Sequence, residues 1–149
     1  MKIKRATESD IKAILSIDPV AANDENRLQH IYKWVSEGSA IIAQNDQAIV
    51  GYAVLEYTFF SLGFITMLIV AKASRRRGVG RALISFLEKK CKTGKLFTST
   101  NESNKPMQAL MEKMSYEPSG VVYNLDYGDP ELFYFKKLGI NRKPRHLSQ

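Results

Sequence analysis

The chain is most informative between Met67 and Leu83, where it reads MLIVAKASRRRGVGRAL. An apolar segment typical of a strand leads into a loop rich in arginine and glycine, and the loop leads directly into a helix predicted to begin near Gly78. Backbone N–H groups in the first turn of a helix lack intrahelical acceptors, and the helix dipole is positive at that end. Arginine adds charge-assisted hydrogen bonds to phosphate oxygens, and glycine lets a bulky anion approach the backbone. The segment therefore predicts a compact anion site.

Two other phosphate-binding motifs do not fit this segment. The chain contains no Gly-x-x-x-x-Gly-Lys-Ser/Thr motif, and Gly78-Val79-Gly80 lacks the third glycine of the dinucleotide-binding fingerprint. A solvated arginine turn that only caps a helix is the remaining alternative. Glycine and arginine content alone leaves both interpretations open.

Hydrophobic periodicity predicts a series of strands and helices around this segment, in the order β-α-α-β-β-β-α-β-α-β-β. Nearly continuous apolar runs suit central strands that are covered on both faces. Gly38 suits the position that follows the C-terminus of a helix. The expected strands are 3–6, 40–44, 48–57, 63–71, 96–100, 119–125 and 131–137, and the expected helices are 11–17, 24–36, from 78 to about 91, and around 107–114.

Length and composition are those of an ordinary soluble globular protein. At 149 residues the chain fits one domain, and its 44% hydrophobic and 25% charged residues are close to the globular average. A single cysteine excludes a disulfide framework and a thiolate zinc cluster within the chain. The first residues lack the apolar core of a secretory signal, and the longest uncharged run, 57–71, is shorter than the ~20 residues of a spanning helix. We expect a cytoplasmic protein with no membrane partner and no metal.

The formal net charge is +7, and without two basic segments the rest of the chain is nearly neutral. Residues 72–81 hold five cationic side chains and no acid, and residues 136–149 hold five more, again without an acid. We assign residues 1–138 to the domain and residues 139–149 to a basic, disordered C-terminal tail. Basic surfaces attract nucleic acids, so a nucleic-acid-binding module is the rival prediction. Against it, the arginines crowd one turn instead of lining a face.

At these residues the sequence resembles the GNAT superfamily of acyl-CoA-dependent N-acetyltransferases. The family motif is an apolar Leu-x-Val strand, an Arg or Gln five residues later, and x-x-Gly-x-Gly/Ala at the start of a helix. Leu68 and Val70 match the strand, and Arg75 follows Val70 by five residues. Gly78 and Gly80 complete the motif. The resemblance implies a GNAT-like fold whose mixed, mostly antiparallel sheet contains two splayed parallel strands with flanking helices.

The resemblance covers residues 2–138 and implies acetyl-CoA as cosubstrate, inserted between the splayed strands at 68–70 and 96–100. Asn104 matches a family position that contacts the cofactor. An equal interpretation is that Asn104 is the N-cap of its own helix, and the two roles are compatible. The implied cofactor-binding residues are Leu68, Ile69, Val70, Arg75, Arg76, Arg77, Gly78, Val79, Gly80, Arg81 and Asn104.

Two positions depart from the family pattern. The family tyrosine that is credited with protonating the departing CoA thiolate corresponds to Met111, and the following family glycine corresponds to Ser115. Methionine cannot donate a proton, so another tyrosine or water serves the thiolate, or no acid is needed. An acyl-CoA-binding sensor without efficient turnover is a further interpretation that Met111 leaves open.

Glu56 is the candidate catalytic base. It is the only carboxylate between Asp46 and Glu88, and it lies near the end of the strand before the anion-binding strand, where the family commonly places a carboxylate that deprotonates the amine. A solvent-facing acid at a strand end is the alternative.

The acceptor is expected to be a primary amine of a small molecule or a peptide. Formation of a homodimer is left open. Five acids could favour a cationic acceptor or could be solvated surface: Asp24, Glu25, Asp126, Asp129 and Glu131.

Overall fold

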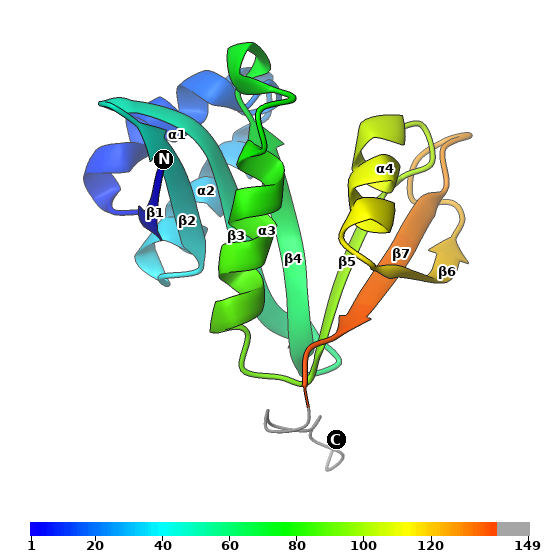
Figure 1. Cartoon of the computed structure of the whole chain (residues 1–149). Helices are drawn as coiled ribbons and strands as arrows, with labels where there is room; N and C mark the ends of the chain where they lie inside the picture. Colours follow the sequence, from blue (N-terminus) through cyan, green and yellow to red (C-terminus); the bar gives the residue numbers. More distant parts are fainter. Residues whose placement is uncertain (140–149) are drawn as a thin grey trace. The chain divides into compact units, whose positions relative to one another are not determined.

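The computed structural model describes residues 1–139, and it contains the predicted order of strands and helices (Figure 1). Apart from Gly139, the predicted tail at 139–149 lies outside the described residues. The strands are β1 (Lys2–Arg5), β2 (Ala40–Asn45), β3 (Ala48–Phe59), β4 (Leu62–Val70), β5 (Lys95–Asn101), β6 (Glu117–Val122) and β7 (Glu131–Lys137). The helices are α1 (Ile11–Ile17), α2 (Glu25–Ser36), α3 (Val79–Lys90) and α4 (Lys105–Lys113), with the short 3-10 turns η1 (Glu8–Asp10), η2 (Ala21–Asn23) and η3 (Lys72–Ser74).

The seven strands form one mixed sheet in the order β1-β2-β3-β4-β5-β7-β6. β4 and β5 are parallel, with Gly63 opposite Leu96 and Ile65 opposite Thr98. The pairs β1–β2, β2–β3, β5–β7 and β6–β7 are antiparallel. A parallel pair needs a long crossover, and α3 lies in the connection from β4 to β5. The prediction of an α/β fold with a mixed, mostly antiparallel sheet and a parallel pair of strands is confirmed.

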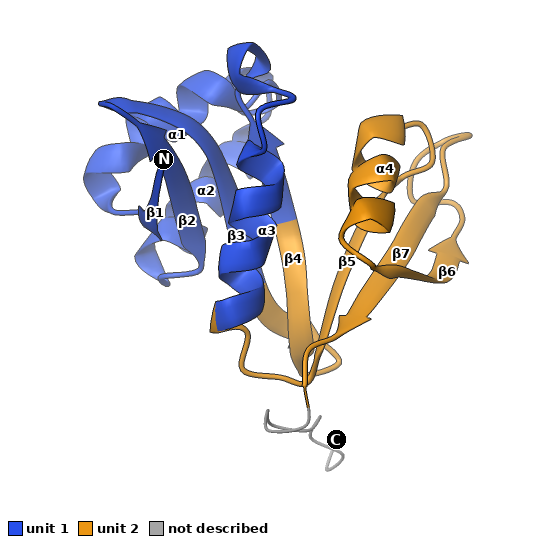
Figure 2. Ribbon diagram, viewed as in Figure 1, with its two compact units in different colours: residues 1–55, 67–89 blue, residues 56–66, 90–149 orange. Residues whose placement is uncertain are grey.

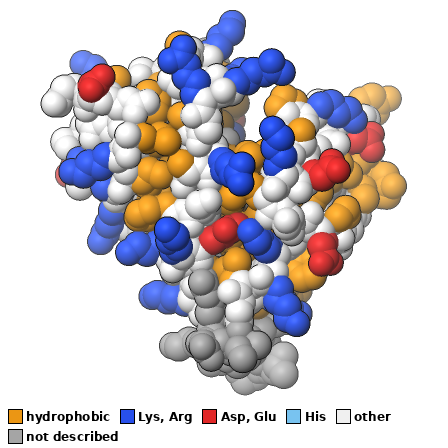
Figure 3. All heavy atoms as spheres, viewed as in Figure 1, with side chains coloured by type: hydrophobic (Ala, Val, Ile, Leu, Met, Phe, Trp, Pro, Cys, Tyr) orange, Lys and Arg blue, Asp and Glu red, His pale blue; other side chains and the backbone are white. Residues whose placement is uncertain are grey.

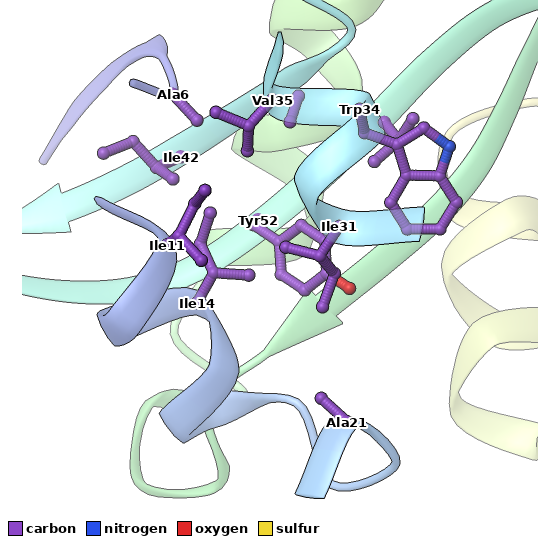
Figure 4. Close-up of a cluster of buried hydrophobic side chains, with 11 residues drawn as sticks. Ala6, Ile11, Ile14, Ala21, Ile31, Trp34, Val35, Ile42 and Tyr52 are labelled. Atoms are coloured by element: carbon purple, nitrogen blue, oxygen red, sulfur yellow. The ribbon is translucent and has the colours of Figure 1, made fainter. Parts of the chain in front are cut away.

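The chain divides into two compact units, which Figure 2 shows in different colours. Unit 1 comprises residues 1–55 and 67–89, and unit 2 comprises residues 56–66 and the chain from residue 90 onward. The core of unit 1 joins α1 and α2 to β2 and β3 (Figure 4). Its buried side chains include Ile11, Ile14, Ile31, Trp34, Val35, Ile42, Tyr52 and Val54.

A buried polar network ties the segment between α1 and α2 to β3. The side chain of Asp18, which follows α1, is fully buried and accepts two hydrogen bonds from Nη1 of Arg27, at 2.9 and 2.8 Å. The hydroxyl of Tyr52 on β3 donates to Oδ2 of Asp18 at 2.5 Å, and the backbone N–H of Val20 donates to Oδ1 at 3.0 Å. Because these donors surround the carboxylate, its charge is compensated inside the core of unit 1.

Unit 2 has its own buried residues and an aromatic cluster. On β5 alternate residues are buried, and Phe97, at an intervening position, contacts aromatic rings of β3 and β7. Phe97 stacks on Phe135 of β7 with centroids 5.5 Å apart, and Phe59 lies 4.8 Å from Phe64. The buried side chains come from β4, β5, α4, β7 and their connections: Leu62, Ile65, Cys91, Thr93, Leu96, Thr98, Thr100, Met111, Met114, Tyr116 and Tyr134.

Several strand ends differ from the prediction. β3 runs on to Phe59 and β4 begins at Leu62, so Phe60 and Ser61 alone connect them, both with positive φ (52° and 63°). Two-residue hairpin turns with positive φ usually contain glycine or asparagine, so the sequence predicted a longer connection between these strands. β6 was expected at 119–125 but includes Pro118 and ends at Val122. It tolerates the proline because it is the outermost strand and its register shifts between Pro118 and Gly120.

Two helices end in the same hydrogen-bonded motif with different residues at the left-handed position. After α2, Gly38 has φ 76°, its N–H donates to the carbonyl of Val35, and that of Ser39 donates to Trp34. This confirms the position predicted for Gly38. After α4, the N–H of Ser115 donates to Glu112 and that of Tyr116 donates to Met111, and Ser115 has φ 65°. Both are Schellman motifs, so a serine occupies a position that favours glycine.

We expect Ser115→Gly to stabilise the fold by about 0.5–1 kcal/mol, because an L residue with a side chain is disfavoured in the left-handed region. Urea unfolding measures the change. The control is Ser36→Gly, which places the same substitution in the last turn of α2 and should lower stability. A loss of stability in Ser115→Gly would contradict the expectation.

Candidate active site

Residues 71–78 connect β4 to α3, and residues 79–81 lie in the first turn of the helix. After η3, Arg75 is extended, Arg76 has φ 63° and Gly78 has φ 81°. The first backbone hydrogen bond of α3 runs from the N–H of Ala82 to the carbonyl of Gly78, at 3.0 Å. The N–H groups of residues 79–81 therefore have no intrahelical acceptor, as an anion site requires.

The arginine side chains of this turn are available to an anion. Arg75, Arg76, Arg77 and Arg81 are all exposed, and none of them pairs with a carboxylate in the described part of the chain. Lys and Arg side chains are spread over the face shown in Figure 3. Nε of Arg75 donates to the carbonyl of Val70 at 3.4 Å, which holds the first arginine against the end of β4. A Cβ added at Gly78 would meet no atom within 4 Å, so the space beside this backbone is open. These features fit the phosphates of acetyl-CoA.

Most other predicted cofactor residues lie on the strand and the helix that flank this turn. Leu68, Ile69 and Val70 form the end of β4 and are half-buried, and Val79 is buried at the start of α3. Gly80 is half-buried in the first turn. Asn104 belongs to unit 2 and is the N-cap of α4, where its Oδ1 accepts from the N–H of Met107 at 3.2 Å. The N-cap interpretation of Asn104 is therefore confirmed.

Gly51 on β3 determines how closely α3 approaches the sheet. A Cβ at this position would lie 3.0 Å from the backbone oxygen of Ile69 and from Cγ1 of Val79, and 3.1 Å from Cδ1 of Leu83. A larger residue would displace the end of β4 or the first turn of α3. Sequence reasoning did not single out Gly51, although a glycine within an apolar strand is the usual signal of a close approach.

Glu56 lies on β3 and is half-buried, and it has a specific partner. The hydroxyl of Thr66 on β4 donates to Oε1 of Glu56 at 2.6 Å. This bond holds the carboxylate against the next strand, and the role of Glu56 as the base stays a prediction. Thr66 was missed because a hydroxyl within an apolar strand has no sequence signal that names its partner.

The acids considered for the acceptor are mostly engaged in internal hydrogen bonds. Asp24 caps α2 by accepting from the N–H groups of Asn26 and Arg27. Three acids of the β6–β7 region bind polar groups of β5 and the loop after it: Asp126 accepts from Asn101, Asp129 from Ser103 and Glu131 from Ser99. Glu25 is exposed in the first turn of α2. These bonds anchor the segment from Asp126 to Glu131 within unit 2.

Met111, at the position of the family tyrosine, is fully buried in α4. Cys91 is buried beside Gly63, and its thiol donates to the carbonyl of Thr93 at 3.7 Å. Among residues 1–139, no group of three or more His, Cys, Asp or Glu side chains is arranged to hold a metal ion. No helix in the same range is long and apolar enough to cross a membrane.

Comparisons with known proteins agree with this architecture. Residues 9–116 match the model of the acetyltransferase (GNAT) family. A GNAT-family acetyltransferase from Bacillus cereus has a TM-score of 0.85 and 34% identity, covering 91% of this chain and 96% of that chain. YncA from Salmonella typhimurium, solved with its cofactor acetyl-CoA, has a TM-score of 0.77 and 20% identity, with 97% of both chains covered.

The ribosomal-protein-S18-alanine N-acetyltransferase from Escherichia coli has a TM-score of 0.77 and 16% identity, covering 93% of this chain and 94% of that chain. The comparison with curated proteins gave no match. The family match spans most of the chain, and the Bacillus cereus structure is similar over nearly its whole length. The resemblance inferred from the Leu-x-Val and Arg-x-x-Gly-x-Gly residues is thereby confirmed, and the chain belongs to the GNAT acetyltransferase family.

Proposed function

We propose that this protein transfers the acetyl group of acetyl-CoA to a primary amine of a small molecule or a peptide. The turn between β4 and α3 carries the proposal, because it combines free helix N-terminal amides, four exposed arginines and an open glycine backbone. Family membership supports the same reaction type. The acetyl-CoA in the YncA structure and the N-acetyltransferase activity in the name of the Escherichia coli protein support the donor and the kind of acceptor.

In this proposal the pyrophosphate of acetyl-CoA binds the amides of residues 76–81 and the guanidinium groups of Arg75, Arg76, Arg77 and Arg81. The pantetheine arm pairs with exposed backbone groups of Leu68, Ile69 and Val70, in the manner of an added strand. Asn104 contributes its side-chain amide, whose NH₂ group is distinct from the oxygen that caps α4.

The proposed reaction is direct aminolysis of the thioester. A primary amine has a pKa of about 10, so at neutral pH it must first give a proton to a base. Glu56 takes this proton, directly or through water. The neutral nitrogen then attacks the carbonyl carbon, the C–N bond forms and the C–S bond breaks. A backbone N–H of β4 stabilises the developing oxyanion.

The departing CoA thiolate takes its proton from water in this proposal. Met111 is buried and has no proton to donate. A thiolate is a tolerable leaving group, so the reaction does not require a side-chain acid at this step. The proposal therefore differs from the usual family mechanism at the last proton transfer only.

We expect acetyl-CoA to raise the melting temperature by several degrees. At a hundredfold excess over Kd the gain in folding free energy is ~2.7 kcal/mol, and each kcal/mol corresponds to roughly 2–4 °C at this size. Differential scanning fluorimetry measures the shift. Gly80→Leu should abolish it, because a side chain in the first turn of α3 occupies the space of the phosphates. The control is Gln29→Leu, which adds the same side chain at an exposed position of α2.

Release of free CoA distinguishes the alternatives. Polyamines, aminoglycosides, amino acids and N-terminal peptides are screened as acceptors with acetyl-CoA. A thermal shift with no release of CoA by any acceptor would favour the acyl-CoA sensor. Binding of DNA that weakens steeply with salt, with no thermal shift from acetyl-CoA, would contradict the enzyme and favour the nucleic-acid-binding module.

A further inference from the structure

Thr66 gives the proposed base a fixed orientation. Its hydroxyl donates to Oε1 of Glu56 at 2.6 Å, a distance typical of a hydrogen bond to a carboxylate. We propose that Thr66 is a positioning residue that holds Glu56 for proton transfer from the acceptor amine. This inference rests on the proposed role of Glu56 and goes beyond it, because it names the residue that decides which carboxylate oxygen reacts.

The two side chains are well placed for such a role. Glu56 and Thr66 belong to unit 2 and come from β3 and β4, which are neighbours in the sheet and are connected by two residues. Both are half-buried. A threonine side chain is stiff at χ1, and its backbone here is part of a strand, so its hydroxyl has few alternative positions. A glutamate alone would sample several rotamers, and each departure from the reactive geometry would lower the rate.

The hydrogen bond makes the two oxygens of the Glu56 carboxylate different. Oε1 accepts from Thr66, whereas Oε2 accepts no hydrogen bond from residues 1–139. In the proposed step, the proton leaves the ammonium nitrogen of the acceptor and binds Oε2, giving a neutral amine and a neutral carboxyl group.

The strand β4 connects this pair to the cofactor segment. Thr66 precedes Leu68 by two residues on the same strand, and Leu68 to Val70 is the segment proposed to bind pantetheine. A strand rises ~3.3 Å per residue, so the hydroxyl and the cofactor segment lie within one short stretch of backbone. We infer that β4 has two roles in the reaction: its backbone binds the donor, and Thr66 orients the base.

Thr66→Val and Thr66→Ser test the proposal in the full chain. Valine keeps the shape of threonine but removes the donor, and we expect kcat to fall roughly tenfold to a hundredfold. The KM for acetyl-CoA and the thermal shift it causes should not change. Serine keeps the hydroxyl and should restore most of kcat. A purely structural role would instead lower the melting temperature of Thr66→Val and change both kinetic constants.

A double variant separates failure of this inference from failure of the proposed function. If Glu56 is the base and Thr66 acts through it, Thr66→Val has no further effect on kcat in the Glu56→Gln background. Wild-type kcat in Glu56→Gln contradicts the base itself. A large loss in Glu56→Gln together with wild-type kcat in Thr66→Val contradicts only the positioning role.

Discussion

Glu56→Gln is expected to lower kcat by at least about a hundredfold, because loss of a working general base typically costs ~10²–10⁴ in rate. Glutamine keeps the size of the side chain and can still accept a hydrogen bond from Thr66, so the fold should be retained. The acetyl-CoA thermal shift should stay at its wild-type value. The change in kcat is measured as the rate of CoA release, with the acceptor that gives the highest rate.

The pH dependence sharpens this test. The wild-type kcat/KM should fall on the acid side of its profile as the base becomes protonated, and the acid limb should disappear in Glu56→Gln. Glu8→Gln, at an exposed acid in η1, is the matched control and should keep the wild-type profile. Near-wild-type turnover in Glu56→Gln would exclude Glu56 and direct attention to Asp126, Asp129 or Glu131.

Arg27→Met is expected to cost about 3–5 kcal/mol of folding free energy, because it leaves the buried carboxylate of Asp18 without its cation. At roughly 2–4 °C per kcal/mol, the melting temperature should fall by about 6–20 °C. Urea unfolding at neutral pH gives the free energy directly. Lys33→Met is the control, since Lys33 lies on the same helix in an exposed pair with Glu37 at 4.0 Å. Such surface pairs contribute at most ~1 kcal/mol.

A double variant tests whether the cost comes from Asp18. In the Asp18→Asn background, where the buried charge is gone, Arg27→Met should cost much less than in the wild type. Equal costs in the two backgrounds would mean that Arg27 stabilises α2 by packing alone. The same comparison identifies the network as the anchor of the segment between α1 and α2.

The pH dependence of this network has a defined sign. Burial raises the pKa of Asp18, but hydrogen bonds from Tyr52, Val20 and Arg27 outweigh it and hold the pKa below its ordinary value of 3.8. The folded state therefore gains stability from Asp18 above pH 3.8, and this gain is lost as the pH falls from 3.8 through the lower folded value. Without Arg27 the carboxyl becomes protonated more readily. The stability difference between wild type and Arg27→Met should therefore narrow in acid.

The pattern of the sequence determined the type and order of the elements. Apolar periods and Gly38 are local signals, and each acts through the backbone of a few neighbouring residues. The turn predicted to bind an anion could be recognised in the same way, because its strand end, arginines, glycines and helix start lie within residues 67–83. The ends of strands were harder to predict, as at the Phe60–Ser61 turn, where two residues other than glycine have positive φ.

Only the tertiary structure decided which distant side chains meet. The bonds of Asp18 to Arg27 and Tyr52, the bond of Thr66 to Glu56 and the close approach of α3 to Gly51 join residues between 9 and 34 positions apart. No short pattern encodes such pairs, because they depend on strand register and on how a helix packs against the sheet. The chemistry of the anion turn is therefore local to the sequence, whereas the orientation of the proposed base and the anchoring of the α1–α2 segment exist only in the folded chain.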